Sequence, residues 1–328
     1  MRKLLWLTIL AGIAYGGYWF IGSRAVLGGV EAALAELKAE GVADVAAVNL
    51  VGFPSRFDVT LSEPHLISTD GQAAWQAPFI QFFALSYRPN HVIAVWPHDQ
   101  TITLGREVLA VKSSNLRASA AVTAGLTLPL EKATVEGHGL GVQSSFGWSV
   151  LAENLIFASR LVADGQNSHE VALVIDGLAP GDDLRRLIDP EGSLPATAEE
   201  VKLDATLSFD RAIDRTLTQG SLHLTGVTGI AAKIVWGKIQ LEARGDLGAD
   251  AEGFAAGRVE ISVRNWRDMY AVFVRAGAVK PEISVTIENA LDALAKGSGD
   301  ADLLKLPLIF QSGRMRLGPI PLGPAPRF

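Results

Sequence analysis

The stretch Val201-Lys202-Leu203-Asp204-Ala205-Thr206-Leu207-Ser208-Phe209 decides the fold class, because every odd position is apolar and every even position is polar. A period of two predicts a β-strand with one buried and one solvated face. The same alternation recurs at Lys238 to Ala243 and Arg258 to Arg264, and less regularly at Phe57 to Leu61, His91 to Trp96 and Val171 to Ile175. Glycine, asparagine, aspartate and proline separate these runs, which indicates antiparallel strands rather than parallel strands linked by helices.

An uncharged apolar run extends from Leu4 to Ile21 at the amino terminus. As a helix this run would be about 27 Å long, close to the hydrocarbon thickness of a bilayer. We therefore predict a single membrane anchor over residues 1–24. Apolar residues then recur at three- and four-residue spacing up to Gly41, a typical helix stop, which predicts a helical stalk over residues 25–41.

A cleavable secretory peptide is the alternative interpretation of this run, with Gly12-Ile13-Ala14 as the small residues before a cut. Cleavage there would leave several aromatic side chains in water at the new terminus. In a spanning helix, Tyr18 and Trp19 instead suit the interfacial aromatic belt. We favour an uncleaved signal-anchor.

The flanking charges and the composition indicate where the rest of the chain lies. Arg2 and Lys3 precede the run and acidic Glu31 and Glu36 follow it, so the positive-inside rule places the amino terminus inside. No second run is long enough to span, and the absence of cysteine is compatible with a bacterial periplasm. We therefore predict a bacterial inner-membrane protein that spans once and keeps the bulk of its chain in the periplasm. A net charge of -6 without a basic cluster beyond the amino terminus argues against a nucleic-acid partner.

Changes of pattern divide the remaining chain into three parts. They are a first β half at 42–177, a linker with a short helix at 178–200, and a second β half at 201–328 with two helices and a proline-rich tail. The linker is proline-rich around the short helix, Asp182 to Ile188.

Two helices and a hairpin are expected late in the second half. A stripe from Trp266 to Val274 predicts the first helix, and Pro281 begins the second, although Ile283 to Ile287 also alternates, so a strand is the alternative there. The hairpin covers Leu306 to Leu317 and turns near Ser312-Gly313. The prolines of the tail that follows are expected to exclude a paired last strand.

No catalytic or metal-binding constellation is recognisable. The six histidines, at 65, 91, 98, 138, 169 and 223, lack both the i, i+4 spacing and the carboxylate partners of a zinc site, so single surface or strand-end positions are expected. Pro97-His98-Asp99 is more typical of a turn than of a catalytic pair, because adjacent strand residues face opposite sides. We therefore expect a protein that is not an enzyme and that has no metal and no cofactor.

Four segments together resemble a bacterial envelope family known as domain of unknown function 2125. They are Gly52-Phe53-Pro54-Ser55-Arg56-Phe57, Trp75-Gln76-Ala77-Pro78, Tyr87-Arg88-Pro89-Asn90-His91-Val92-Ile93-Ala94 and the ending Leu317-Gly318-Pro319-Ile320-Pro321-Leu322-Gly323-Pro324-Ala325-Pro326. The resemblance covers nearly all of the chain after the anchor, and these motifs carry no known chemistry.

The second half also resembles, more loosely, the carboxyl-terminal region of AsmA-like proteins, which are anchored in the inner membrane and lie in the periplasm. The similar feature is a meander that leads into Asn265-Trp266 and a helix. This resemblance implies a long curved sheet with an apolar concave face, which relatives use to shelter lipid chains or to affect outer-membrane assembly.

We thus expect a mainly β protein with a few helices, in which an N-terminal transmembrane helix precedes a large curved antiparallel sheet. The first functional hypothesis is that it binds or conveys a lipid-like amphiphile, or assists envelope assembly, through an open apolar groove. The groove candidates are Val201, Leu203, Leu207, Phe209, Ile239, Leu241, Val259, Ile261 and Val263. The alternative is a structural scaffold that packs these residues in a closed core and contacts a protein partner through Trp75, Trp96 or the tail.

Overall fold

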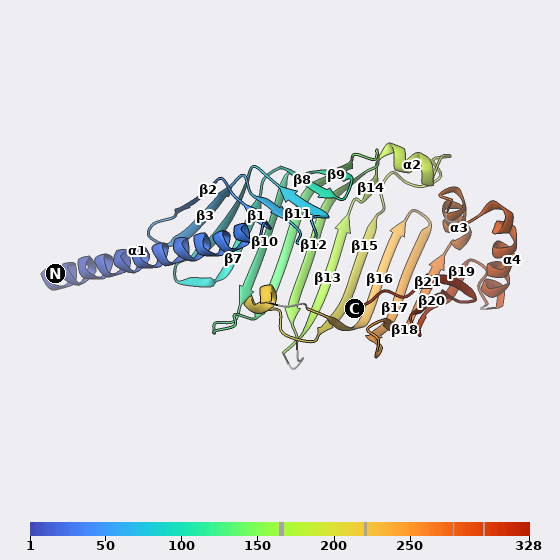
Figure 1. Cartoon of the computed structure of the whole chain (residues 1–328). Coiled ribbons are helices and arrows are strands. Elements are labelled where there is room, and N and C mark those ends of the chain that lie inside the picture. Colours follow the sequence, from blue (N-terminus) through green and yellow to red (C-terminus); the bar gives the residue numbers. More distant parts are fainter. Residues whose placement is uncertain (164–166, 220–221, 278, 298) are drawn as a thin grey trace. The chain divides into compact units, whose positions relative to one another are not determined.

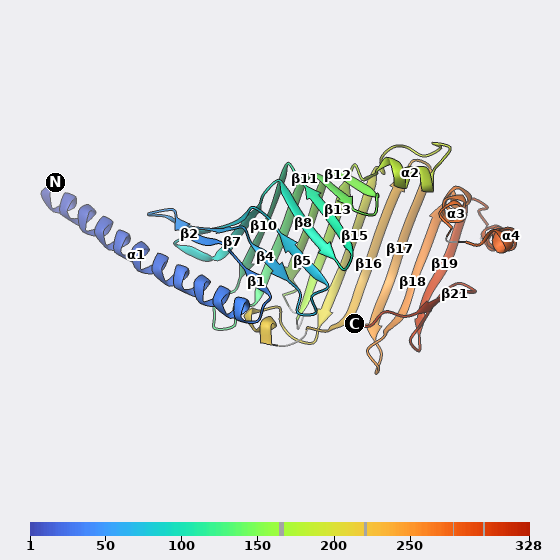
Figure 2. The same ribbon diagram turned by 45° about the horizontal axis from the view of Figure 1, so that its top comes forward.

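The computed structural model, shown in Figures 1 and 2, describes residues 1–163, 167–219, 222–277, 279–297 and 299–328. It is mainly β, with a long apolar amino-terminal helix and antiparallel strands, which confirms the predicted fold class. The chain forms two compact units. Unit 1 comprises Met1–Ala124 and Val135–Phe146, and unit 2 comprises Gly125–Thr134 and Gly147–Phe328.

The predicted anchor and stalk form one continuous helix, α1 (Arg2–Ala39). Within the described residues, α1 alone is long and apolar enough to cross a membrane. Every residue from Met1 to Tyr15 is exposed, whereas partly buried positions recur from Gly16 onward. In both views the first turns of α1 extend beyond the strands of unit 1 (Figures 1 and 2). The helix ends before Gly41, whose φ of 74° is the left-handed conformation of a helix stop.

The second half of the apolar run packs against the rest of unit 1. The hydroxyl oxygen of Tyr15 lies 3.0 Å from Ser86 Oγ, and the Tyr18 hydroxyl donates a 2.7 Å hydrogen bond to the main-chain oxygen of Ser86. Trp19 Nε1 donates a 2.7 Å hydrogen bond to the main-chain oxygen of Arg56. Tyr18 and Trp19, which the sequence predicts in an interfacial belt, therefore hold α1 against the rest of unit 1.

Unit 1 contains two antiparallel ladders. The first has the order β2 (Ala47–Val51), β3 (Arg56–Ser62), β6 (Phe79–Leu85), β7 (Arg88–Trp96) and β10 (Asn115–Val122). The second has the order β1 (Ala43–Asp44), β4 (His65–Ile67), β5 (Ala73–Gln76), β8 (Asp99–Leu104), β9 (Glu107–Lys112) and the later part of β11 (Leu130–Ser144), whose residues up to Thr134 belong to unit 2. The runs predicted at Phe57 to Leu61 and His91 to Trp96 are confirmed as β3 and β7.

Unit 2 is an antiparallel meander in which each long strand pairs with the next one. Its strands are β12 (Ser149–Leu161), β13 (Ser168–Asp176), β15 (Glu200–Phe209), β16 (Leu224–Trp236), β17 (Ile239–Ala249), β18 (Ala255–Arg264), β19 (Leu303–Gln311), β20 (Arg314–Leu317) and β21 (Ile320–Pro324). The short β14 (Ala179–Pro180) pairs with β12, and a 3-10 turn covers Arg215–Gln219. Helix α2 (Asp182–Ile188) has the predicted bounds, while the division of the chain at 178–200 stays a prediction.

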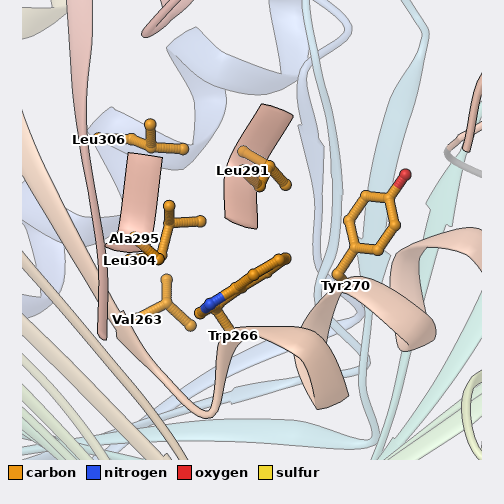
Figure 3. Packing of buried hydrophobic residues seen from close by; sticks show 7 residues of the cluster. All are labelled: Val263, Trp266, Tyr270, Leu291, Ala295, Leu304 and Leu306. Carbon is orange, nitrogen blue, oxygen red and sulfur yellow. The ribbon is translucent and has the colours of Figure 1, made fainter. Parts of the chain in front are cut away.

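Two helices between β18 and β19 cover one end of this meander. They are α3 (Trp266–Arg275) and α4 (Pro281–Gly297), so the second predicted segment is a helix and not a strand. A buried cluster joins them to β18 and β19, as Figure 3 shows. Its members are Val263, Trp266, Tyr270, Leu291, Ala295, Leu304 and Leu306.

The expectation of an unpaired tail is wrong. Strand β21 pairs with β20, with Pro321 opposite Arg316 and Pro324 opposite Arg314. Prolines are tolerated in edge strands, since their missing N–H groups can fall on the side without a neighbouring strand. The hairpin before it turns at Ser312 and Gly313, as predicted.

Candidate functional site

One face of unit 2 is apolar across seven consecutive strands from β12 to β19. The pairing register aligns two rows of side chains across these strands. The first row contains Leu155, Ile175, Val201, Ile234, Leu241, Val263 and Leu304, and the second contains Phe157, Leu173, Leu203, Ala232, Ala243, Ile261 and Leu306. We call the side of these strands that carries the two rows the apolar face.

All nine groove candidates lie on the apolar face, because they occupy odd positions on β15, β17 and β18 and the register keeps these positions on one side. Strand β16 has a bulge between Val227 and Ile230, but the odd-numbered residues of β15 and β17 stay on the same side of the sheet across it. The structure therefore brings the predicted residues together as one surface. Their role as a binding site stays a prediction.

The apolar face is covered at one end and more open in the middle. On β18 and β19 it lies under α3 and α4, and Leu306 is 5% exposed. The carboxyl-terminal tail covers a neighbouring part, where Ala325 and Phe328 pack with Val259 and Phe310. On β15 and β16, by contrast, Leu203 is 36% and Ile234 is 37% exposed. A continuous hydrophobic surface thus passes from a closed core to a partly uncovered region.

The opposite face of the same strands carries charged pairs. Glu200 contacts Lys202 Nζ at 2.6 Å and Lys233 Nζ at 2.7 Å, and Arg160 pairs with Glu170 at 2.5 Å. Hydrogen bonds from Lys202 and then Lys233 lower the pKa of Glu200 to about 2. These ion pairs keep this part of the opposite face polar, so the apolar face is the better candidate for contact with a hydrophobic ligand.

A buried polar pair interrupts the apolar face near the start of β13. His169 aligns with Leu161 and Leu207, is 2% exposed, and has its Nδ1 3.2 Å from Ser159 Oγ. Burial lowers the pKa of His169, because the charged imidazolium would lose its hydration. The predicted strand-end position of His169 is correct. Its burial was not predicted, although the apolar residues Val171 and Ala172 that follow it could have indicated it.

The residues expected to contact a protein partner in the scaffold alternative do not form an exposed surface of this kind. Trp75 is half-buried and donates a 2.9 Å hydrogen bond from Nε1 to Gln100 Oε1, and Trp96 is also half-buried. The proline-rich tail is paired as β21 and packs on unit 2 at Ala325. Among the described residues, no three His, Cys, Asp or Glu side chains gather in a group that could hold a metal ion.

Comparison with known proteins identifies a family over nearly the whole chain. A family model described as "Uncharacterized protein conserved in bacteria (DUF2125)" matches residues 19–326. The matched region begins at Trp19, which bonds to Arg56, whereas Tyr15 and Tyr18, which bond to Ser86, lie before it. Searches of curated proteins and of solved structures give no match. The looser resemblance to AsmA-like proteins stays a prediction.

Proposed function

The chain belongs to this family of uncharacterised bacterial proteins, and from that premise we propose that it is a membrane-anchored protein that binds or conveys a lipid-like amphiphile without covalent catalysis. In this proposal α1 spans the bacterial inner membrane, and the strands lie in the periplasm. The apolar face of unit 2 receives the acyl chains. Assistance with envelope assembly would be the physiological outcome of such transfer.

The observation that carries the proposal is the partly uncovered centre of the apolar face. Large exposed apolar patches are unusual on soluble proteins and commonly mark binding sites. Leu203 and Ile234 face each other diagonally across β15 and β16 and are each more than one-third exposed, while the reverse side of these strands is charged. An acyl chain laid across the rows would gain about 25 cal/mol for each Å² of apolar surface removed from water.

The test is to measure lipid that copurifies with the full-length protein in mild detergent, by mass spectrometry of the extract. The informative variant is Leu203→Asp, which places a carboxylate on the apolar face. The matched control is Thr206→Asp, which adds the same charge to the opposite face of β15. Lipid that surrounds α1 is common to all three proteins, so a difference between the variants reports on the apolar face.

We expect wild type and Thr206→Asp to retain lipid, and Leu203→Asp to lose it several-fold while still unfolding cooperatively. Equal lipid content in stable Leu203→Asp protein would remove β15 from any binding site. Absence of lipid from the wild type, beyond that of an unrelated single-span protein, would reject the proposal.

The alternative function, a scaffold that acts through protein contacts, is favoured by the covered end of the apolar face. There α3 and α4 close a core around Trp266, which is 2% exposed. If a second protein covers Leu203 and Ile234 in the same way, crosslinking from these positions in cells should capture a defined partner instead of lipid.

A further inference from the structure

We infer that two turns of unit 1 enter the bilayer beside α1 and form a second lipid contact. The turns are residues 51–55, from the last residue of β2 to the start of β3, and residues 85–88, from the last residue of β6 to the first of β7; together we call them the membrane-facing turns. This inference rests on the proposed anchoring by α1 and adds a contact that the anchor alone does not require.

The length of α1 sets the depth of these turns. The hydrocarbon of a bilayer is about 30 Å thick and takes roughly 20 helical residues. The freely exposed stretch from Leu4 to Ala14 covers only about 16 Å. With Leu4 at one edge of the hydrocarbon, the other edge lies near Arg24, and a typical tilt of about 20° changes this little. Residues from Tyr15 to Gly22 therefore lie within the hydrocarbon or at its border.

A shallower position of α1 does not remove the difference between the length of this exposed stretch and the thickness of the hydrocarbon. If only Leu4 to Ala14 were immersed, the helix could not span, or Arg2 and Lys3 would enter the hydrocarbon, where charged side chains are strongly disfavoured. The helix therefore carries Tyr15 to Gly22 to membrane depth together with whatever is packed against them.

The membrane-facing turns are packed against this part of α1. The rings of Phe53 and Trp19 meet edge to face with centroids 5.2 Å apart, and the Phe53 ring also lies beside Gly16. The two turns hold each other, since the main-chain N–H of Ser86 donates a 2.9 Å hydrogen bond to the oxygen of Ser55. Both turns therefore share the depth of Gly16 to Trp19.

The chemistry of the membrane-facing turns suits a lipid environment. Val51 is 53%, Phe53 is 65% and Tyr87 is 67% exposed, so apolar and amphipathic side chains project outward. Ser86, the polar residue between them, is fully buried and bonded to Tyr15 and Tyr18. Non-helical backbone is tolerated at membrane depth only where its polar groups are satisfied by protein in this way.

Basic side chains lie at the expected border of the hydrocarbon. Arg24 is exposed at this level, where a cation attracts anionic headgroups, and Arg88, the last residue of the second turn, is exposed and has a side chain long enough to extend toward the same border. Arg56 pairs with the buried carboxylate of Asp58 at 2.7 Å, so this acidic charge has a cationic partner within the protein. The occupant of this surface is therefore a lipid bilayer that contains anionic lipid.

The chain has no cysteine, so single labels can be placed without other changes. We would attach a nitroxide to Phe53→Cys, Tyr87→Cys, Leu10→Cys and Phe146→Cys in the full-length protein, in vesicles of equimolar phosphatidylcholine and phosphatidylglycerol. Phe146 is the matched control, because it is also 67% exposed and belongs to unit 1 but lies at the end of β11. Spin relaxation by oxygen, which enters hydrocarbon, is compared with relaxation by a water-soluble nickel complex.

The labels at positions 10, 53 and 87 should be relaxed more by oxygen, and the label at 146 more by nickel. Nickel relaxation at 53 and 87 with oxygen relaxation at 10 would overturn the inference and leave the anchor intact. Nickel relaxation at 10 as well would reject the anchor and the inference together. Protection from both reagents with dipolar broadening would place a second copy of the chain on the turns, which also overturns it. Tyr87→Cys keeps the contact of Phe53 with Trp19, so it tests the surface even if Phe53→Cys loosens the first turn.

Discussion

Gly22 of α1 leaves the space that the ring of Phe57 on β3 fills, because a Cβ at this position would lie 2.8 Å from Phe57 Cζ. Gly17, one and a half turns earlier, has no neighbour within 4 Å of the corresponding position. The two glycines therefore provide a matched test of whether α1 is fixed to the strands. Both replacements by leucine gain helix propensity of about 1 kcal/mol.

We predict that Gly22→Leu lowers the free energy of unfolding by about 1–3 kcal/mol through overpacking against Phe57, whereas Gly17→Leu is neutral or stabilising. Chemical denaturation of both variants in mild detergent measures this difference. Equal stabilities would contradict the close packing of α1 on β3.

Leucines at two positions of one row on the apolar face should differ in their contribution to stability. Leu306 is 5% exposed beneath α3 and α4, and Leu203 is 36% exposed. We expect Leu306→Ala to cost about 2–5 kcal/mol, because it leaves a cavity in a packed cluster. Leu203→Ala should cost less than about 1.5 kcal/mol. Urea unfolding of the two variants checks this, and a similar large cost at both positions would indicate that the face is closed along its whole length.

Burial of His169 predicts a loss of stability at acidic pH. The pKa of His169 is lowered from 6.5, so below pH 6.5 the unfolded chain binds more protons than the native protein. The contribution of neutral His169 to the free energy of unfolding is complete above pH 6.5. It is lost as the pH falls toward the native pKa, with a slope of at most about 1.4 kcal/mol per pH unit. The variant His169→Leu should show a flatter dependence between pH 5 and 7. Parallel curves for wild type and variant would show that this histidine does not link folding to protons.

Trp266 should tolerate replacement by phenylalanine better than its burial suggests. Its Nε1 donates a 3.0 Å hydrogen bond to the oxygen of Ala301, but Arg267 also donates to that oxygen at 3.1 Å. The acceptor therefore keeps a partner, and we expect Trp266→Phe to cost about 1–2 kcal/mol from the lost bond and contacts. Trp266→Ala should cost about 3–5 kcal/mol. Thermal melting of both variants checks the order.

Local patterns in the sequence predict much of the fold. Strict alternation places Val201 to Phe209 within one residue of β15, because a strand with one charged and one apolar face must keep that period. The short helix Asp182 to Ile188 is predicted with its observed bounds. The ambiguity after Pro281 arises because Ile283 and Val285, which suggest a strand, are exposed in α4, whereas the buried Leu291 and Ala295 decide for a helix.

Features that depend on contacts distant in sequence could not be predicted. Nothing in the periodicity of the apolar run indicates that Tyr15 and Tyr18 bond to Ser86, since both residues also fit a lipid interface. The pairing of β21 depends on its position at an edge, which composition does not reveal. For the candidate site, the pattern predicts which residues share a face, but the covering of its end by α3 and α4 is a tertiary property.

The continuity of α1 has a mechanical consequence. Its first turns are free, its middle is bonded to Arg56 and Ser86, and no break separates the two parts. If α1 spans a bilayer as proposed, a thinner membrane that increases the tilt of the helix also rotates the strands of unit 1 relative to the membrane surface. Under that proposal, bilayer thickness would set the angle between the strands of unit 1 and the membrane.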